Sequence, residues 1–296
     1  MSSHSHSQEV INLNSKLKFG ILLNTIFTII QFTVGIISGS LALISDAGHN
    51  LTDSLSLVIS YFAQKMSGRK STPDKTYGYG RATIISALIN SVILITLAIY
   101  IFYEAYTRIL HPEAVSGSLI AIVSFIGILV NGGIALLFRN STKDLNMRSA
   151  FLSMAFDTLA SVGALIAGII IYFTHFFIID AIVSIIIGLM LLFSAWGVLK
   201  DALHILFEGT PRGIDFEKVK KEIFDAFPEI TNVDDLHIWS ISSNKTALSC
   251  HITLEKSDIQ KSVEIVTEVK KILHDRFAIE HSTIEIELSP CIDGVC

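Results

Sequence analysis

Residues 41–53 read L-A-L-I-S-D-A-G-H-N-L-T-D, and the apolar run S-L-S-L-V-I-S-Y-F follows them. His49 and Asp53 therefore lie inside a segment that is otherwise lipid-soluble. Ionisable side chains are costly in hydrocarbon, and those that occur there commonly serve a function. The stretch predicts a membrane helix that carries a binding site.

The composition of the whole chain agrees with a membrane protein. Of its 296 residues, 51% are apolar and only 17% are charged, a combination that is uncommon in soluble domains. The formal net charge of -5 gives no indication of a nucleic-acid partner. Three cysteines are too few for a disulfide framework and favour a reducing compartment.

Six apolar segments are long enough to cross about 30 Å of hydrocarbon, which takes about 20 helical residues. They are residues 17–37, 41–64, 82–106, 118–138, 147–173 and 176–199. The connections 65–81 and 139–148 carry five and three Lys or Arg residues, whereas the alternate connections carry at most one. Because positively charged loops stay in the cytoplasm, both termini are expected there.

We expect three parts: a cytoplasmic N-terminal tail with a short His-containing segment (1–16), a six-helix transmembrane domain (17–201) and a cytoplasmic C-terminal domain (209–296). The C-terminal domain alternates helix-like and strand-like pieces in the order αββαβ. Two helices on one face of a small sheet leave the other face or an edge for a partner, so dimerisation is expected. The predicted fold class is an α-helical membrane protein with six transmembrane helices and a small cytoplasmic α+β domain.

His49 and Asp53 are four residues apart, so on a helix they share one face and lie about 6 Å apart along the axis. Neutral imidazole and carboxylate suit a borderline divalent metal such as zinc. Two ligands are too few, and the fifth apolar segment supplies the comparable carboxylate, Asp157, with Ser153 one turn earlier. We predict a metal site of these residues. The competing interpretation is that His49 hydrogen-bonds a neighbouring helix and that the aspartates are protonated or paired.

Other polar residues in the spans are given different roles. Asp46 and Asp180 lie nearer the span ends and are expected to reach interfacial water. Buried amides between membrane helices more often bond a neighbouring helix than bind an ion. The amides concerned are Asn24, Gln31, Asn90 and Asn131.

Together these features resemble the cation diffusion facilitator family of divalent-metal transporters. The resemblance is carried by the six spans, by S-L-A-L-I-S-D-A-G-H-N-L-T-D (40–53), by P-D-K-T-Y-G-Y-G-R (73–81), by an aspartate in the fifth span followed by S-V-G, and by the αββαβ tail. It implies a homodimer in the lipid bilayer that exports zinc or a related ion from the cytoplasm in exchange for protons. It also implies that the protein is not an enzyme.

The transport site of this family usually has a His or Asp followed by Asp in span two, and His followed by Asp in span five. His49, Asp53 and Asp157 match that pattern, whereas Ser153 stands where a histidine is expected. A hydroxyl is a weak zinc ligand beside imidazole. The resemblance therefore leaves open a transporter with an altered preference for cadmium, manganese, iron or cobalt.

The resemblance also implies secondary sites in the soluble parts. H-S-T-I-E-I-E-L-S-P-C (281–291) is similar to the metal-binding end of the family's tails, and a regulatory zinc would be held by a set of four residues. The positions that match the family pattern are His281, Glu287 and Cys291. His251 completes the set, because Glu285 and Glu287 share one strand face and this pair is expected next to His251 of a neighbouring strand. The alternative is a solvated sheet face. Arg81 and Glu208 match a charge pair that links the bundle to the tail.

Two interpretations come from other classes of protein. One is a non-transporting metal sensor subunit that has lost a ligand at Ser153. The other is an intramembrane aspartyl protease that uses Asp53 and Asp157. His49 one turn from Asp53 argues against the protease, because such chemistry needs a matched pair of aspartates without an adjacent metal ligand. The short loops favour a bacterial inner membrane as the location.

Overall fold

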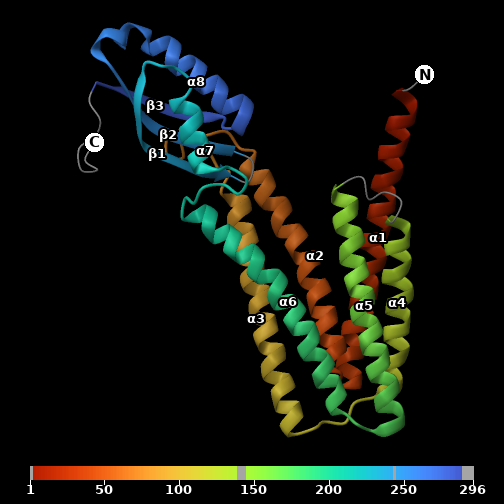
Figure 1. Cartoon of the computed structure of the whole chain (residues 1–296). Helices are drawn as coiled ribbons and strands as arrows, with labels where there is room; N and C mark the ends of the chain where they lie inside the picture. The colour runs from red at the N-terminus through yellow and green to blue at the C-terminus, as the bar shows by residue number, and fades with distance from the viewer. Residues whose placement is uncertain (1–2, 139–144, 243–244, 289–296) are drawn as a thin grey trace. The chain divides into compact units, whose positions relative to one another are not determined.

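The computed structural model describes residues 3–138, 145–242 and 245–288; side chains are described from residue 20 onward, except those of residues 21, 57, 138 and 145–150. Six long helices come first (Figure 1): α1 Ser3–Ser38, α2 Leu41–Ser67, α3 Ala82–Leu110, α4 Gly117–Phe138, α5 Leu145–Thr174 and α6 Ile178–Leu206. The tail contains α7 Phe216–Phe224, β1 Ile230–Ser242, β2 Lys245–Leu254, the short 3-10 helix η2 Lys256–Lys261, α8 Ser262–Phe277 and β3 His281–Glu287. The αββαβ order of the tail is confirmed.

The helices extend beyond the apolar segments from which they were predicted. The α1 helix begins at Ser3, inside the stretch expected to be a tail, and α6 continues to Leu206. Helix propagation costs little once a first turn has formed, so polar flanks can continue a helix. A residue with a non-helical conformation then ends the helix. The α1 helix stops before Gly39, whose φ of 71° is one that glycine adopts readily.

Four helices in the described part of the chain are long and apolar enough to cross a membrane. They are α3, Gly117–Leu137 of α4, Phe151–Thr174 of α5, and α6. In α1 the continuous part whose side chains are described, Leu22–Ser38, is apolar, and α2 carries a polar stripe that includes Asp46, His49 and Asp53. The expectation of six spans is therefore supported for four helices, and the same polar residues that suggest a site explain why α2 is not among them.

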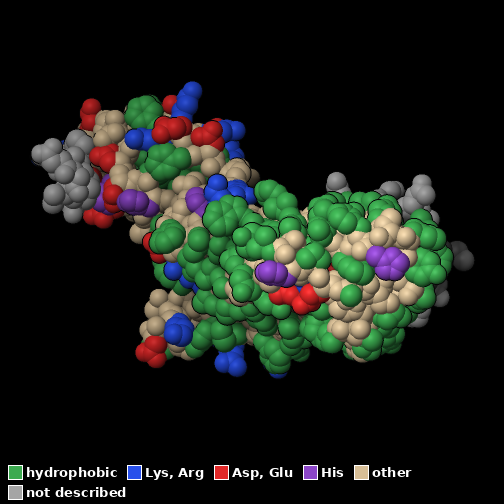
Figure 2. Space-filling view, turned by 90° about the horizontal axis from the view of Figure 1, so that it is seen from below, with side chains coloured by type: hydrophobic (Ala, Val, Ile, Leu, Met, Phe, Trp, Pro, Cys, Tyr) green, Lys and Arg blue, Asp and Glu red, His purple; other side chains and the backbone are tan. Residues whose placement is uncertain are grey.

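The surface of the helical part is apolar. Large hydrophobic side chains are exposed along the first six helices. On the face seen in Figure 2, hydrophobic side chains cover most of the helical part, whereas charged side chains gather on the C-terminal domain. Exposed apolar patches of this extent indicate contact with lipid.

The chain divides into two compact units, residues 1–58 with 90–197 and residues 59–89 with 198–296. In the first unit, α4 and α5 approach closely at two glycines. A Cβ atom on Gly117 would lie 2.7 Å from the carbonyl oxygen of Gly168, and a Cβ atom on Gly168 would lie 2.9 Å from the carbonyl oxygen of Gly117. Glycines at such crossings let the backbones of membrane helices pack closely. This contact fixes α5, which carries Asp157.

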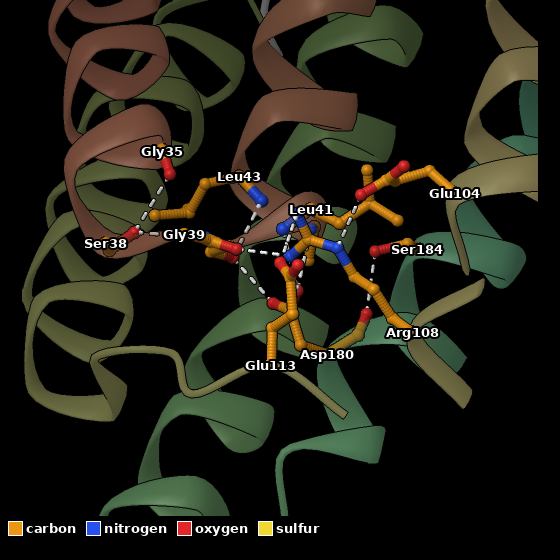
Figure 3. Close-up of polar contacts among 12 residues, drawn as sticks. Gly35, Ser38, Gly39, Leu41, Leu43, Glu104, Arg108, Glu113, Asp180 and Ser184 are labelled. Atoms are coloured by element: carbon orange, nitrogen blue, oxygen red, sulfur yellow. Dashed lines mark hydrogen bonds and ion pairs between the residues drawn. The ribbon is translucent and has the colours of Figure 1, made fainter. Parts of the chain in front are cut away.

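Asp180 of α6 fixes the beginning of α2 (Figure 3). The Ser40 hydroxyl donates to Asp180 Oδ1 at 2.6 Å, and the Leu41 amide donates to Asp180 Oδ2 at 2.7 Å. Arg108, near the end of α3, donates to the Gly39 carbonyl and lies 4.0 Å from Asp180 Oδ2. Asp180 is 1% exposed, so the expectation that it reaches interfacial water is wrong. The first backbone amides of α2 have no partner within the helix, and the positive end of the helix dipole lies there. They bind the Asp180 carboxylate in place of the water that was expected to do so.

The tail is a three-stranded sheet with helices on one face. The strand order is β1-β2-β3, with β1 antiparallel and β3 parallel to β2. Leu248, Cys250 and Ile252 of β2 pack with buried residues of α7 and α8 in one core. Side chains alternate along a strand, so Ser249, His251 and Thr253 lie on the opposite face. That face carries the polar residues discussed below.

Candidate metal site

His49, Asp53 and Asp157 converge in the first unit. His49 and Asp53 lie one turn apart on α2, and their Nε2 and Oδ2 atoms are 3.8 Å apart. Asp157 comes from α5, and its Oδ1 atom lies 4.0 Å from the same Nε2 atom. The structure therefore brings together two elements that are distant in sequence around a single imidazole nitrogen. An imidazole and two carboxylates at one point form a ligand set for a divalent cation.

Two polar atoms of this set have no hydrogen-bond partner in the described residues. They are Nδ1 of His49 and Oδ2 of Asp157, and Asp157 is only 4% exposed. Buried polar groups are normally hydrogen-bonded, and an exception calls for a water, an ion or a catalytic role. The site is therefore one in which a cation would compensate for buried charge.

The spacing of the set is slightly wider than that of a closed zinc site. Bonds of about 2.0–2.2 Å in a tetrahedron place ligand atoms about 3.3–3.6 Å apart. The two measured separations from His49 Nε2 are 3.8 and 4.0 Å. Within the described ranges, no three His, Cys, Asp or Glu side chains are arranged tightly enough to enclose a metal. A cation would have to draw these ligands together by a few tenths of an ångström.

Ser153 lies on α5 one turn before Asp157, and it is half-buried. Its position i−4 places it on the same face of the helix as Asp157. A hydroxyl there can supply one weak ligand or hold a water.

Asp46 is buried one turn before His49, at 2% exposure, and Gln31 of α1 donates its Nε2 proton to Asp46 Oδ2 at 2.7 Å. The expectation that Asp46 reaches interfacial water is therefore wrong, because an amide from another helix satisfies its carboxylate. The hydrogen bond from Gln31 to Asp46 also confirms the prediction that the Gln31 amide bonds a neighbouring helix. Asn90 plays the same part, since the Ser56 hydroxyl of α2 donates to its Oδ1 atom. Asn131 is buried as well, but neither of its amide atoms has a hydrogen-bond partner among the described residues, so the expected interhelical bond is not found for it.

The polar face of the tail gathers a second group of titratable residues around His251. Its Nδ1 atom lies 3.0 Å from Glu287 Oε1, and its Nε2 atom lies 3.7 Å from both Glu285 Oε2 and Asp235 Oδ2. Asp235 in turn lies 2.8 Å from Nε2 of His237. Of the predicted set, the structure thus joins His251 and Glu287.

His281 does not belong to this group. It begins β3 and pairs with Ala247, whereas Glu287 at the far end of the strand pairs with Thr253. Its ring instead packs edge-on against Tyr77, with centroids 5.7 Å apart. Cys291, the fourth predicted member, lies outside the described residues. The structure shows the expected placement of Glu285 and Glu287 beside His251. Asp235 was missed, although the D-D-L-H run at 234–237 was a usable signal.

Arg81 and Glu208 form the expected pair. Arg81 Nη2 lies 3.0 Å from Glu208 Oε1. Both side chains are exposed, so solvent screens the interaction. Glu208 has a φ of 60°, which costs a non-glycine residue conformational energy.

Comparison with protein families gives two adjoining matches. Residues 17–207 match a cation efflux transmembrane domain, and residues 211–289 match the cytoplasmic domain of cation efflux proteins. The two matches follow one another along nearly the whole chain.

Several curated proteins are similar over almost their full length. A metal cation efflux system protein, CzcD, from Cupriavidus metallidurans is 36% identical over 98% of this chain and 91% of its own. A cadmium, cobalt and zinc/H(+)-K(+) antiporter from Bacillus subtilis is 37% identical over 96% of this chain and 91% of its own. The zinc transporter ZitB of Escherichia coli is 34% identical over 99% of this chain and 95% of its own. A solved structure of the metal-bound C-terminal domain of CzcD is 36% identical and covers 25% of this chain and 100% of its own, with a TM-score of 0.24.

Proposed function

The chain belongs to the cation diffusion facilitator family, and we propose that it exports a divalent metal ion, zinc first, from the cytoplasm in exchange for protons. The family consists of transporters rather than enzymes. The observation that carries the proposal is the convergence of His49, Asp53 and Asp157 from two helices on one point. The names of the relatives, which specify zinc, cadmium and cobalt, support a transition-metal substrate.

The donor set favours zinc over harder cations. Imidazole nitrogen suits zinc, copper, iron and nickel, whereas magnesium and calcium prefer all-oxygen sites. Ser153 provides only a hydroxyl in place of a second nitrogen. A site with one nitrogen and several oxygens would hold zinc less tightly than a two-histidine site, and it would accept cadmium, cobalt, manganese or iron more readily.

Exchange with protons follows from the chemistry of the ligands. Zinc binds neutral imidazole and ionised carboxylates, so its binding displaces protons and protonation displaces the metal. A carrier that presents His49, Asp53 and Asp157 to one side at a time therefore couples the two flows in opposite directions.

The proposed arrangement in the membrane uses all six long helices as spans, with residues 1–16 and 209–296 in the cytoplasm of a bacterial inner membrane. The Lys and Arg residues in connections 65–81 and 139–148 support that orientation. The match to the cytoplasmic domain supports a homodimer through the tail. The group around His251 would hold a regulatory zinc in this domain.

Transport can be measured in everted membrane vesicles loaded with a fluorescent proton indicator. We expect zinc to release protons from acidified wild-type vesicles. His49→Ala and Asp157→Asn should each reduce this flux at least about tenfold, because loss of a ligand costs at least as much as loss of its supporting contacts. His111→Ala and Glu113→Gln serve as matched controls, since both residues are exposed in the connection that follows α3.

Experiments with the same vesicles distinguish a transporter from a metal sensor and from a protease. Full proton flux in His49→Ala or Asp157→Asn would refute the assigned site. Zinc binding without any flux in the wild type would indicate a sensor, and cleavage of a membrane peptide that depends on Asp53 and Asp157 would indicate a protease. Cadmium, cobalt, manganese and iron tested beside zinc give the order of preference.

A further inference from the structure

We propose that a basic pocket in the second unit binds the phosphate of an anionic phospholipid headgroup. The pocket has a volume of about 680 Å³. It lies between the connection that follows α2 and the ends of the strands, and its walls come from residues 67–80, 241–242, 245–246 and 280–281. It contains none of the candidate metal ligands His49, Asp53, Asp157 and His251.

The charges of the lining favour an anion. Arg69 and Lys70 contribute from the connection, and Lys245 contributes from the start of β2. Glu280 is the one carboxylate among the lining residues. Among the ion pairs formed by the described residues, none includes Arg69, Lys70 or Lys245. Three cations that face one pocket without a carboxylate partner are available to an anionic ligand.

The lining also supplies neutral donors. Hydroxyl groups line the pocket beside the three cations, and each can donate to a phosphate oxygen. They belong to Ser67, Ser71, Thr76, Tyr77, Tyr79, Ser242 and Thr246. Phosphate accepts several hydrogen bonds at once, and guanidinium and ammonium groups are its usual partners in proteins.

The connection that forms one wall is held in shape by its own hydrogen bonds. The Thr72 and Lys75 backbones bond each other at 3.2 and 3.0 Å, and the Gly78 amide donates to the Lys75 carbonyl at 2.8 Å. Gly78 has a φ of 77°, which favours glycine at this turn. The wall is therefore preformed, which lowers the entropic cost of binding.

This wall also packs directly on the sheet. A Cβ atom on Gly80 would lie 2.8 Å from the Cβ atom of Ser242, so only glycine permits the approach. The Tyr77 ring contacts the ring of His281 edge-on, at 90°. This contact gives His281 a place in the wall of the pocket rather than in the tail's group around His251.

The position of the pocket along the chain selects a lipid as the source of the phosphate. Its lining begins at Ser67, where α2 ends. In the orientation proposed above, that end of α2 meets the cytoplasmic leaflet. Basic pockets at this level of a membrane protein bind anionic headgroups, and each Lys or Arg near such a surface adds to the attraction. The lipid assignment thus rests on the proposed orientation, whereas the phosphate chemistry of the pocket does not.

Binding can be measured on the full-length protein in neutral detergent by microscale thermophoresis. The probes are dioctanoyl phosphatidylglycerol, dioctanoyl phosphatidylcholine and inorganic phosphate. We expect phosphatidylglycerol to bind at least about tenfold more tightly than phosphatidylcholine. The triple variant Arg69→Gln, Lys70→Gln and Lys245→Gln should lose at least about tenfold in affinity for phosphatidylglycerol.

A matched control removes the same charge elsewhere in the tail. Lys218, Lys220 and Lys270 are exposed lysines on α7 and α8, and their triple Gln variant should keep wild-type affinity. Lys245→Arg should retain binding and Lys245→Gln should weaken it, so that the proposal does not depend on the fold of one triple variant.

Each outcome of the binding experiment either supports or overturns the proposed phosphate site. Inorganic phosphate that binds as tightly as phosphatidylglycerol, and is lost with the pocket triple, would confirm the phosphate site and assign it to a soluble ligand. Equal losses in the two triple variants would mean non-specific attraction to net charge and would overturn the proposal. Unchanged affinity in the pocket triple would overturn it as well. Proton flux in vesicles tests the transport function separately, since His49→Ala should leave lipid binding intact.

Discussion

The Nε2 atom of His49 lies 4.0 Å from Oδ1 of Asp157, and it lies 3.8 Å from Oδ2 of Asp53. One imidazole nitrogen is thus faced by two carboxylates from different helices. Asp157 is only 4% exposed, and burying its carboxylate without a positive charge beside it is unfavourable. A divalent cation, or protons, would relieve that cost, and this is the physical basis of the exchange proposed for the site.

Ser153→His should tighten zinc binding, because it adds a second nitrogen one turn before Asp157. We expect a gain of about tenfold or more in affinity by calorimetry. Ser118→His is the control, since Ser118 is exposed at the start of α4. Unchanged affinity in Ser153→His would place this side chain outside the site.

The group on the polar face of the tail makes a prediction that distinguishes two histidines. In the full-length protein with His49→Ala, we expect residual zinc binding to be lost in His251→Ala and kept in His281→Ala. The reason is that Glu287, Glu285 and Asp235 surround His251, whereas His281 contacts Tyr77. The measurement is the zinc stoichiometry by calorimetry. Loss in both variants, or in neither, would contradict the arrangement.

The sequence was sufficient for the type and order of the elements because the signals there are local. Apolar length predicted the helices, and alternation predicted the strands of the tail. The spacing of His49 and Asp53 fixed one helical face, and Asp157 was the one comparable carboxylate in the fifth segment. No local pattern links Asp157 to His49 and Asp53; the link is that a zinc ion needs more ligands than one helix supplies.

The features that the sequence did not predict depend on contacts between distant parts of the chain. Asp180 was expected in interfacial water, yet it caps a helix that begins at Leu41, a pairing that only tertiary packing sets. In the tail, the period of two predicts that Glu285 and Glu287 share one face of β3 beside His251, and the structure shows this. His281 was added through the family resemblance, but it lies at the other end of the strand, about 20 Å from Glu287 at about 3.3 Å per residue.

Asp180→Ala should destabilise the fold more than a typical polar substitution. It leaves the Ser40 hydroxyl and the Leu41 amide without their buried acceptor and removes a carboxylate near Arg108. We expect a loss of about 3 kcal/mol in the free energy of unfolding. The measurement is the midpoint of thermal unfolding in detergent, with Glu113→Gln as the control. Glu113 is exposed and also faces Arg108, at 3.6 Å, so its change should cost less than about 1 kcal/mol.

Cys250 should resist alkylation in the folded protein. It is 1% exposed in the core of the tail, and burial raises the pKa of its thiol from 9.0 to about 12. The thiolate is the reactive form, so a variant with Cys291→Ser and Cys296→Ser should react with N-ethylmaleimide only after unfolding. The raised pKa stabilises the thiol form. Its contribution to stability is therefore complete below the unfolded pKa near 9 and is lost as the pH rises toward 12. Rapid labelling of the folded variant at pH 8 would contradict the burial.

Glu208 combines an ion pair with an unfavourable backbone conformation, and two substitutions separate these effects. Glu208→Gln removes only the charge that faces Arg81 and should cost less than about 1 kcal/mol, because both side chains are exposed. Glu208→Gly removes the charge but also relieves the φ of 60°, so it should be more stable than Glu208→Gln by about 1 kcal/mol. Ala278→Gly is the matched control, since Ala278 has a φ of 53° at the end of α8 without any charge. Thermal unfolding of the three variants checks the order, and a Glu208→Gly protein less stable than Glu208→Gln would show that relief of the positive φ does not stabilise this position.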